Sequence, residues 1–210
     1  MKEKFFPIIV LMLFLTLLFP SQVLAESNEN LDIKVTIEDR RWDVKLFGLF
    51  PNPAQFLFGS VDFINVSFEE DSSQPDELHV TMNLRDLSKL LPEFDSGYTV
   101  SWWMNNIHYC LVVHRLPSNQ ISQYAIGHSE ESNDGIVQWT DCDGVFDVEQ
   151  DCIKWSVLKE DIGDPSPFNR LTSIYATTFV RKIYDERSGA DLFKDLAFNA
   201  KSSIDYVIKY

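Results

Sequence analysis

Apolar and polar residues alternate with a period of two along most of this chain, and that alternation limits the fold more than any other feature of the sequence. In residues 77–84, ELHVTMNL, every even position is apolar and every odd position is polar. The apolar set is Leu78, Val80, Met82 and Leu84. Because successive side chains of a β-strand point to opposite faces, this segment is predicted to be a strand with one buried face.

Segments of the same type recur at intervals of roughly 8 to 20 residues, separated by turns rich in Gly, Pro, Asn and Asp. The segment 61–68, VDFINVSF, also qualifies, although its apolar residues occupy both odd and even positions. The remaining predicted strands cover residues 31–37, 98–103, 107–115, 122–127, 136–140, 144–148, 152–158, 171–180 and 204–210. The triplets NDG (133–135) and CDG (142–144) are the strongest hairpin signals. Short helices are expected within 84–93, 160–163 and 190–196.

About ten strands with little helix predict an all-β fold, namely an antiparallel β-sandwich that is jelly-roll-like and carries minor short helices. A closed barrel would produce the same sequence pattern and remains the alternative. Nothing in the chain suggests βαβ units or internal repeats. We therefore expect residues 31–210 to form a single domain, which is long enough for a substantial core.

The first 25 residues have the layout of a secretory signal peptide. Lys2 and Lys4 precede an apolar run over residues 5–19, and Val23 and Ala25 are small or branched residues at the expected cleavage positions. The run is shorter than the roughly 20 apolar residues that span a bilayer, so cleavage after Ala25 is favoured over an uncleaved anchor. Residues 26–30 are then a disordered lead-in, and the protein is expected to be secreted or at the cell surface, with no membrane span in the mature chain.

The charge of the chain argues against two classes of partner. The formal net charge is −14, and removing Lys2, Glu3 and Lys4 with the signal would make it −15. Such a surface repels phosphate backbones, and no Lys/Arg cluster suggests a basic stripe. We therefore do not expect the protein to bind nucleic acid or an anionic membrane surface.

Three cysteines would enter an oxidising compartment, and an odd number cannot pair completely within one chain. Cys142 and Cys152 bracket nine residues and could close a disulfide loop. If the intervening Asp-Gly makes a tight hairpin, the two would instead lie at opposite ends of the next strand, too far apart to bond. Cys110 is interpreted as a buried thiol in an apolar strand.

The passage 98–115, YTVSWWMNNIHYCLVVHR, predicts a hairpin that turns at MNN (104–106). On its second strand one face holds Tyr109, Leu111 and Val113, and the other holds His108, Cys110, Val112 and His114. The two histidines on that second face are six residues apart, or about 20 Å in a strand, so one metal ion cannot bridge them.

The tryptophans are the candidate ligand-binding residues. Trp102 and Trp103 must point to opposite faces of a regular strand, so one can fill the core and the other can face outward. The full candidate set is Trp102, Trp103, Trp139 and Trp155. An exposed ring among them could stack on a sugar, with nearby Asn, Asp and Glu bonding the hydroxyls. Core packing is the alternative for all four.

Catalytic and metal motifs are scarce. The sequence has no nucleophile elbow, no His-Glu-x-x-His, no phosphate-binding glycine loop and no Cys-x-x-Cys, so we do not expect an enzyme. Asp141, Asp143 and Asp147 around Gly144 partly resemble a calcium loop but depart from its spacing. No cofactor is expected, with a loosely held calcium ion at these aspartates as the alternative and a solvated turn as the simpler interpretation.

Four segments together resemble the DOMON-like and family-nine carbohydrate-binding-module-like group of secreted β-sandwiches. They are GSVDFINVSFEED (59–71), DELHVTMNLRDL (76–87), GYTVSWWMNNIHYCLVVH (97–114) and CIKWSVLKEDIGDP (152–165). The resemblance implies extracellular ligand binding, to sugars in some members and to haem in others. Haem-binding members use a Met and a His, for which this chain offers only Met82 or Met104 with His108, His114 or His128.

These observations lead to one favoured function and two alternatives. We expect a secreted, non-catalytic binding or surface-associated module whose ligand is an extracellular glycan or protein, with carbohydrate favoured. The alternatives are a haem- or metal-binding domain of electron-transfer type and a structural surface protein with protein partners.

Overall fold

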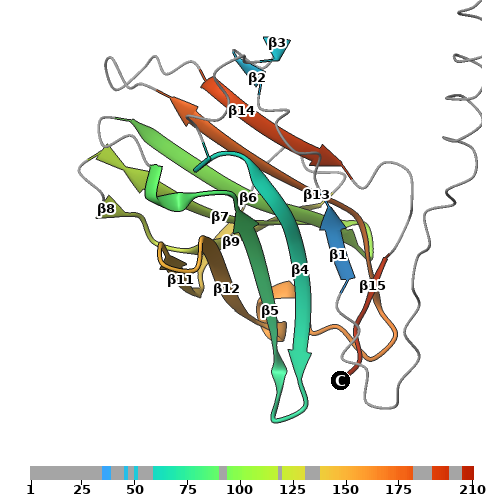
Figure 1. Ribbon diagram of the computed structural model, residues 1–210. Coiled ribbons are helices and arrows are strands. Elements are labelled where there is room, and N and C mark those ends of the chain that lie inside the picture. The colour runs from blue at the N-terminus through green and yellow to red at the C-terminus, as the bar shows by residue number, and fades with distance from the viewer. Residues whose placement is uncertain are drawn as a thin grey trace, which may run out of the picture. The chain divides into compact units, whose positions relative to one another are not determined.

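Two antiparallel sheets make up most of the described part of the chain (Figure 1). The structure is a computed structural model and describes residues 35–38, 45–46, 50–51, 59–89, 94–117, 120–130, 138–181, 191–198 and 205–210. The expected signal peptide (1–25) and lead-in (26–30) lie outside the described residues, as does the NDG triplet. None of the helices in the described ranges has the length and hydrophobicity needed to cross a bilayer.

The smaller sheet has five strands. In spatial order they are β1 (Val35–Glu38), β4 (Phe63–Asp71), β5 (Gln74–Leu84), β12 (Cys152–Leu158) and β11 (Asp143–Asp147). The 3₁₀ helix η2 (Leu87–Lys89) follows β5, and η4 (Lys159–Ile162) follows β12. Both short helices fall in segments where the sequence predicts one.

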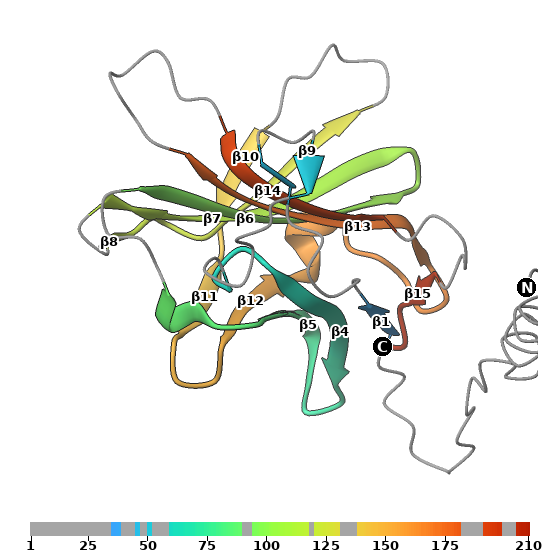
Figure 2. The same ribbon diagram turned by 45° about the horizontal axis from the view of Figure 1, so that its top comes forward.

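The larger sheet forms the second layer of the sandwich, as the turned view shows (Figure 2). In spatial order its strands are β10 (Gln138–Asp141), β9 (Ala125–Glu130), β7 (Ile107–Leu116), β6 (Asp95–Met104), β13 (Arg170–Arg181), β14 (Asp191–Phe198), β2 (Lys45–Leu46) and β3 (Phe50–Pro51). Two short strands lie off this path: β8 (Gln120–Ile121) pairs with β7, and β15 (Tyr206–Val207) pairs with β13. The described strands form two separate sheets, so the fold is a sandwich, as predicted, and not a closed barrel.

The hydrophobic core lies between the two sheets, and the alternation of the sequence explains which side chains enter it. In β5 the apolar positions 78, 80, 82 and 84 are buried, while the polar positions between them are partly exposed. In β7, Tyr109, Leu111 and Val113 are buried and the residues between them are not. The sheets meet directly at Phe68 of β4 and Trp102 of β6, whose rings make an edge-to-face contact at 5.7 Å. The period-two prediction is confirmed in both sheets.

A β-bulge resolves the irregular pattern of residues 61–68. The pairing of β4 with β5 shifts register between Phe63 and Asn65, which leaves Ile64 exposed on the surface. Phe63 is buried before the shift, and Val66 and Phe68 are buried after it. The bulge therefore moves the buried set from odd to even positions, which is why apolar residues occupy both in the sequence.

Two local predictions are wrong. Residues 190–196 were expected to be helical, but β14 begins at Asp191 and pairs along β13, because the exposed edge of β13 offers a continuous row of backbone partners. The CDG triplet was expected to form a hairpin, but β10 belongs to the larger sheet and β11 to the smaller one. Gly144 is needed there for a close approach, since a Cβ atom would lie 2.2 Å from the ring of Tyr124.

Candidate functional site

The hairpin of β6 and β7 places Trp102 and Trp103 on opposite faces of the larger sheet. Trp102 has no solvent exposure and packs in the core. Trp103 is half-buried on the outer face, where its ring lies 5.1 Å from the ring of His108. The predicted division of the two tryptophans is therefore confirmed, and Trp103 is the one available to a ligand.

A cavity of about 500 Å³ opens beside Trp103 at the end of the hairpin. The described side chains that line it are Trp103, Met104, Asn105, Asn106, Arg170, Thr172 and Ser173. They supply an aromatic ring, amides, hydroxyls and one guanidinium group. None of these described lining residues is acidic, and Arg170 is the one charged residue among them.

The backbone around this cavity adopts conformations that side-chain-bearing residues seldom take. Asn105 and Asn106 form the two-residue turn between β6 and β7 with φ values of 52° and 64°, as the MNN prediction of a turn requires. Ser173 has a φ of 49° and lies where the pairing of β13 with β6 shifts register between Thr172 and Tyr175. Bulges and left-handed residues concentrate at binding sites because they redirect side chains, and here all three line one cavity.

Contacts with Thr172 and His108 hold Trp103 in place, and His108 in turn contacts Tyr175. Thr172 Oγ1 donates a hydrogen bond to the carbonyl oxygen of Trp103 at 3.3 Å. His108 stacks on Tyr175 with ring centroids 6.0 Å apart, and its Nε2 lies 3.2 Å from the Tyr175 hydroxyl. Burial lowers the pKa of His108, so its imidazole is neutral at neutral pH and packs as an aromatic ring. The arrangement suits stacking and hydrogen bonding to a neutral or anionic ligand.

The other candidate tryptophans do not join this site. Trp155 is fully buried in the core, where its ring meets Tyr124 at 6.5 Å. Trp139 is 52% exposed on β10, and its register with Gly127 places it on the same outer face as Trp103. Strands β7 and β9 lie between them. Of the four candidates, Trp102 and Trp155 therefore fill the core, while Trp103 and Trp139 lie on the outer face and are separated across the sheet.

The three candidate calcium ligands are not brought together. Asp141 and Asp143 line a second cavity of about 290 Å³ together with Glu77 and Asp161. Asp147 lies at the far end of β11, where its Oδ1 accepts hydrogen bonds from the backbone N–H groups of Glu149 and Gln150. Asp147 thus stabilises the following turn, and the extended strand between it and Asp143 prevents a common ion site.

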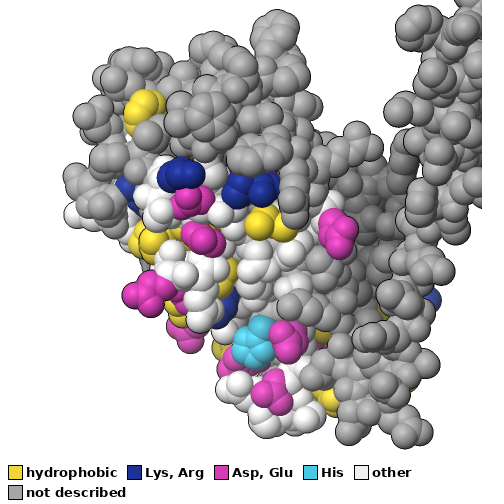
Figure 3. All heavy atoms as spheres, in the orientation of Figure 1, with side chains coloured by type: hydrophobic (Ala, Val, Ile, Leu, Met, Phe, Trp, Pro, Cys, Tyr) yellow, Lys and Arg dark blue, Asp and Glu magenta, His cyan; other side chains and the backbone are white. Residues whose placement is uncertain are grey.

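The acidic side chains of the described residues do not form a metal site. On the face drawn in Figure 3, Asp and Glu side chains are scattered among other types. No group of three or more His, Cys, Asp or Glu side chains within the described ranges could hold a metal ion.

Of the two alternatives for Cys142 and Cys152, the structure has the one in which they lie at opposite ends of a strand and form no disulfide. Both cysteines are free, and so is Cys110. Cys152 pairs with Asp147 at the end of β11, whereas Cys142 precedes the start of that strand. The two thiols are therefore separated by the length of a strand, on the order of 15 Å or more, which a disulfide cannot span. The pKa of Cys142 is raised to about 12 by burial and then by Asp143, Asp161 and Asp141.

The larger sheet separates the candidate haem-binding methionines from two of the three candidate histidines. Met82 and Met104 are buried in the core, while His108 and His114 lie on the outer face. His114 instead contacts Asp95 at 3.4 Å, and His128 packs beside Tyr109 at 6.1 Å. Since the methionines and the first two histidines face opposite sides of a sheet, they cannot bind one iron atom.

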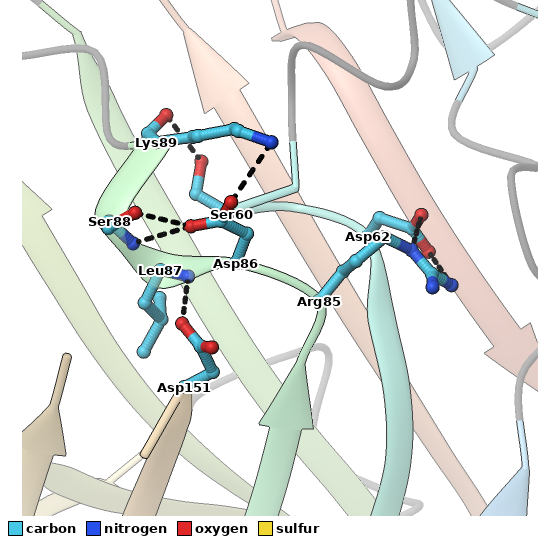
Figure 4. Close-up of polar contacts among 8 residues, drawn as sticks. All are labelled: Ser60, Asp62, Arg85, Asp86, Leu87, Ser88, Lys89 and Asp151. Atoms are coloured by element: carbon cyan, nitrogen blue, oxygen red, sulfur yellow. Dashed lines mark hydrogen bonds and ion pairs between the residues drawn. The ribbon is translucent and has the colours of Figure 1, made fainter. Parts of the chain in front are cut away.

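Two of the segments that carry the family resemblance meet in a polar cluster, which Figure 4 shows. Arg85 Nε lies 2.6 Å from Asp62 Oδ2, and the carboxylate of Asp62 has no solvent exposure. The Asp86 carboxylate accepts from the Ser88 backbone N–H at 3.1 Å and contacts Lys89 at 2.9 Å. The hydrogen bond from the Ser88 hydroxyl to the same carboxylate, and then that from Lys89, lower the pKa of Asp86.

This cluster ties the end of β5 to two neighbouring loops. Asp151 Oδ1 accepts a hydrogen bond from the Leu87 backbone N–H at 2.6 Å, and the Ser60 hydroxyl donates to the Lys89 carbonyl at 3.4 Å. Each bond joins chain segments or closes a turn, so these residues stabilise the fold.

Sequence reasoning identified Trp103 but missed the rest of its cavity. Asn105 and Asn106 were interpreted only as turn residues, and Arg170, Thr172 and Ser173 had no local signal because β13 lies far along the chain from β6. Comparison of the chain with protein families, with curated proteins and with solved structures gives no match.

Proposed function

We propose that this chain is a secreted, non-catalytic binding module that holds a saccharide in the cavity beside Trp103. The observation that supports it most is a half-buried aromatic ring next to amide and hydroxyl groups in a cavity of about 500 Å³. Saccharides present an apolar C–H face that stacks on an indole and hydroxyls that pair with Asn, Thr and Ser. The volume falls within the range of small-molecule sites.

Binding is favoured over catalysis by the chemistry of the lining. Hydrolysis of a glycosidic bond needs two carboxyl groups that flank it. Asn105, Asn106, Thr172 and Ser173 cannot serve as acid or nucleophile in that reaction, and no described residue of the lining has a carboxyl group. The proposal therefore assigns recognition to this cavity and no reaction.

Secretion is the part of the proposal that depends on residues 1–25. Lys2, Lys4 and the apolar run before Ala25 support a cleavable signal. Expression of the full chain in a secreting host followed by N-terminal sequencing tests this. A mature chain beginning at Glu26 is expected, and a chain that keeps Met1 would contradict it.

Binding is tested by a glycan array followed by titration calorimetry on the saccharides retained. Trp103→Ala should abolish binding without unfolding the protein, since the ring lies outside the main core. Trp139→Ala is the matched control, because it removes a tryptophan from the same face of the sheet but outside the cavity. Equal binding by the wild type and Trp103→Ala, or loss of binding in Trp139→Ala alone, would contradict the proposal.

A further inference from the structure

Arg170 gives the cavity beside Trp103 a positive charge, although the net charge of the chain is negative. The protein carries a formal charge of −14, yet the one charged group among the described lining residues is this guanidinium. We infer that the ligand is an acidic saccharide, one containing a uronic or sialic acid, whose carboxylate binds Arg170. This inference rests on the function proposed above and names its ligand class.

The guanidinium is placed to receive a ligand. Arg170 opens β13, pairs with Val207 of β15 and has a side chain that is 66% exposed. Its Nη1 contacts Asp205 Oδ2 at 3.3 Å, a long single contact. A guanidinium has five N–H donors, so the contact with Asp205 leaves most of them for a ligand.

A carboxylate suits these donors better than a hydroxyl does. Arginine binds carboxylates through two parallel hydrogen bonds that are shorter and stronger than neutral ones. Trp103 would stack on the sugar ring while Asn105 and Asn106 meet its hydroxyls. The overall negative field of the protein works against an anion in solution, but it is screened beyond about 8 Å at physiological salt. The local contact with Arg170 therefore decides whether the cavity prefers an acidic or a neutral saccharide.

Asp205 is the competing partner, and this gives a control. If Arg170 only anchors the segment 205–210, removing Asp205 should loosen that segment and leave ligand affinity unchanged. If Arg170 binds a ligand carboxylate, Asp205→Asn frees the guanidinium and strengthens binding.

The experiment compares a trigalacturonic acid with its fully methyl-esterified form, beside an array that holds uronic- and sialic-acid saccharides and matching neutral ones. We expect the acidic array members to bind in preference to the neutral ones. For the acid that binds, calorimetry should give at least about a tenfold weaker affinity for the esterified form, because charge-assisted hydrogen bonds are lost. Arg170→Gln should remove this difference, Arg170→Lys should restore part of it, and Asp205→Asn should increase it. Unfolding temperatures of all variants check that the fold is retained.

The outcomes separate the two proposals. Equal binding of acidic and neutral saccharides, with Trp103→Ala abolishing both and Arg170→Gln affecting neither, overturns the acidic-ligand inference and leaves the saccharide-binding function standing. Loss of the preference in Arg170→Gln with retained neutral binding supports the inference. If no member of the array binds, both proposals fail.

Discussion

Lys159 Nζ lies 2.6 Å from Glu70 Oε1, and neither side chain is more than 5% exposed. Glu70 occupies a core-facing position of β4, in phase with Val66 and Phe68. Its second oxygen accepts hydrogen bonds from the Tyr206 hydroxyl at 2.9 Å and the Lys209 backbone N–H at 2.8 Å. Lys159 Nζ also donates to the Tyr210 carbonyl at 2.5 Å. This pair therefore fastens residues 206–210 to the sandwich.

Removing one charge of this pair should be far more damaging than removing both. Lys159→Met leaves a buried carboxylate without a counter-charge and should lower the free energy of unfolding by about 3–5 kcal/mol. The double variant Glu70→Gln/Lys159→Met buries no charge and should recover much of that loss. Urea unfolding curves of the wild type, both single variants and the double variant measure this. If Lys159→Met lowers the free energy of unfolding by less than about 1 kcal/mol, the pair is not shielded from solvent as described.

Gly97 of β6 lies beneath the ring of Phe179 on β13, and the two residues are register partners. A Cβ atom at Gly97 would lie 2.2 Å from two carbons of that ring. Gly97→Ala should therefore destabilise the protein by about 1–3 kcal/mol through overpacking. Combining it with Phe179→Leu should cost less than the two single losses added together, because the smaller side chain removes the clash. Additive losses in denaturant unfolding would contradict this contact.

The three cysteines should all be free thiols in the secreted protein. Iodoacetamide applied to the unreduced, denatured chain should add three carbamidomethyl groups by mass spectrometry, one for each cysteine. A chain that takes up only one group would contain a disulfide and contradict the separation of Cys142 from Cys152 by β11.

In the native protein Cys142 should react slowly. Its pKa of about 12 leaves a thiolate fraction on the order of one in ten thousand near pH 8, and the thiolate is the reactive form. Asp143→Asn removes a neighbouring negative charge that raises this pKa, so the variant should be alkylated faster. Asp147→Asn, at the other end of the same strand, is the control and should not change the rate at Cys142.

The free energy of unfolding should fall as the pH is lowered, and His108 should contribute to this fall. Burial lowers its pKa below the ordinary value of 6.5, so the unfolded state binds more protons than the folded state as the pH falls through 6.5. The stabilisation from the neutral ring is therefore complete above that value and is lost progressively below it. His108→Gln should flatten the fall in the free energy of unfolding between about pH 7.5 and about pH 5. Identical pH profiles for the wild type and this variant would count against the buried position of the ring.

Much of the fold could be predicted because strand periodicity is a local property. The faces of residues 78–84 and 107–115 followed from the alternation alone, and so did the opposite orientations of Trp102 and Trp103. The MNN turn was predictable for the same reason, since a two-residue hairpin with left-handed asparagines is specified by its own residues.

Features that depend on partner strands could not be predicted in this way. Residues 191–198 form a strand because β13 presents an edge to them, and the CDG triplet carries the chain between sheets because β10 pairs with β9 and β11 with β12. The switch of buried positions within β4 required a bulge that is visible only in its pairing with β5. Glu70 was one acidic residue among many until Lys159 and Tyr206 were found beside it.

The amino-acid sequence alone determined that this is an all-β protein and, in its regular strands, which side chains enter the core, because neighbouring residues of an extended chain must point in opposite directions. The tertiary structure decided which strands became neighbours, and hence that Trp103 shares a cavity with Arg170, Thr172 and Ser173. Pairing across a sheet joins residues that are distant along the chain, and no local pattern in either segment specifies its partner.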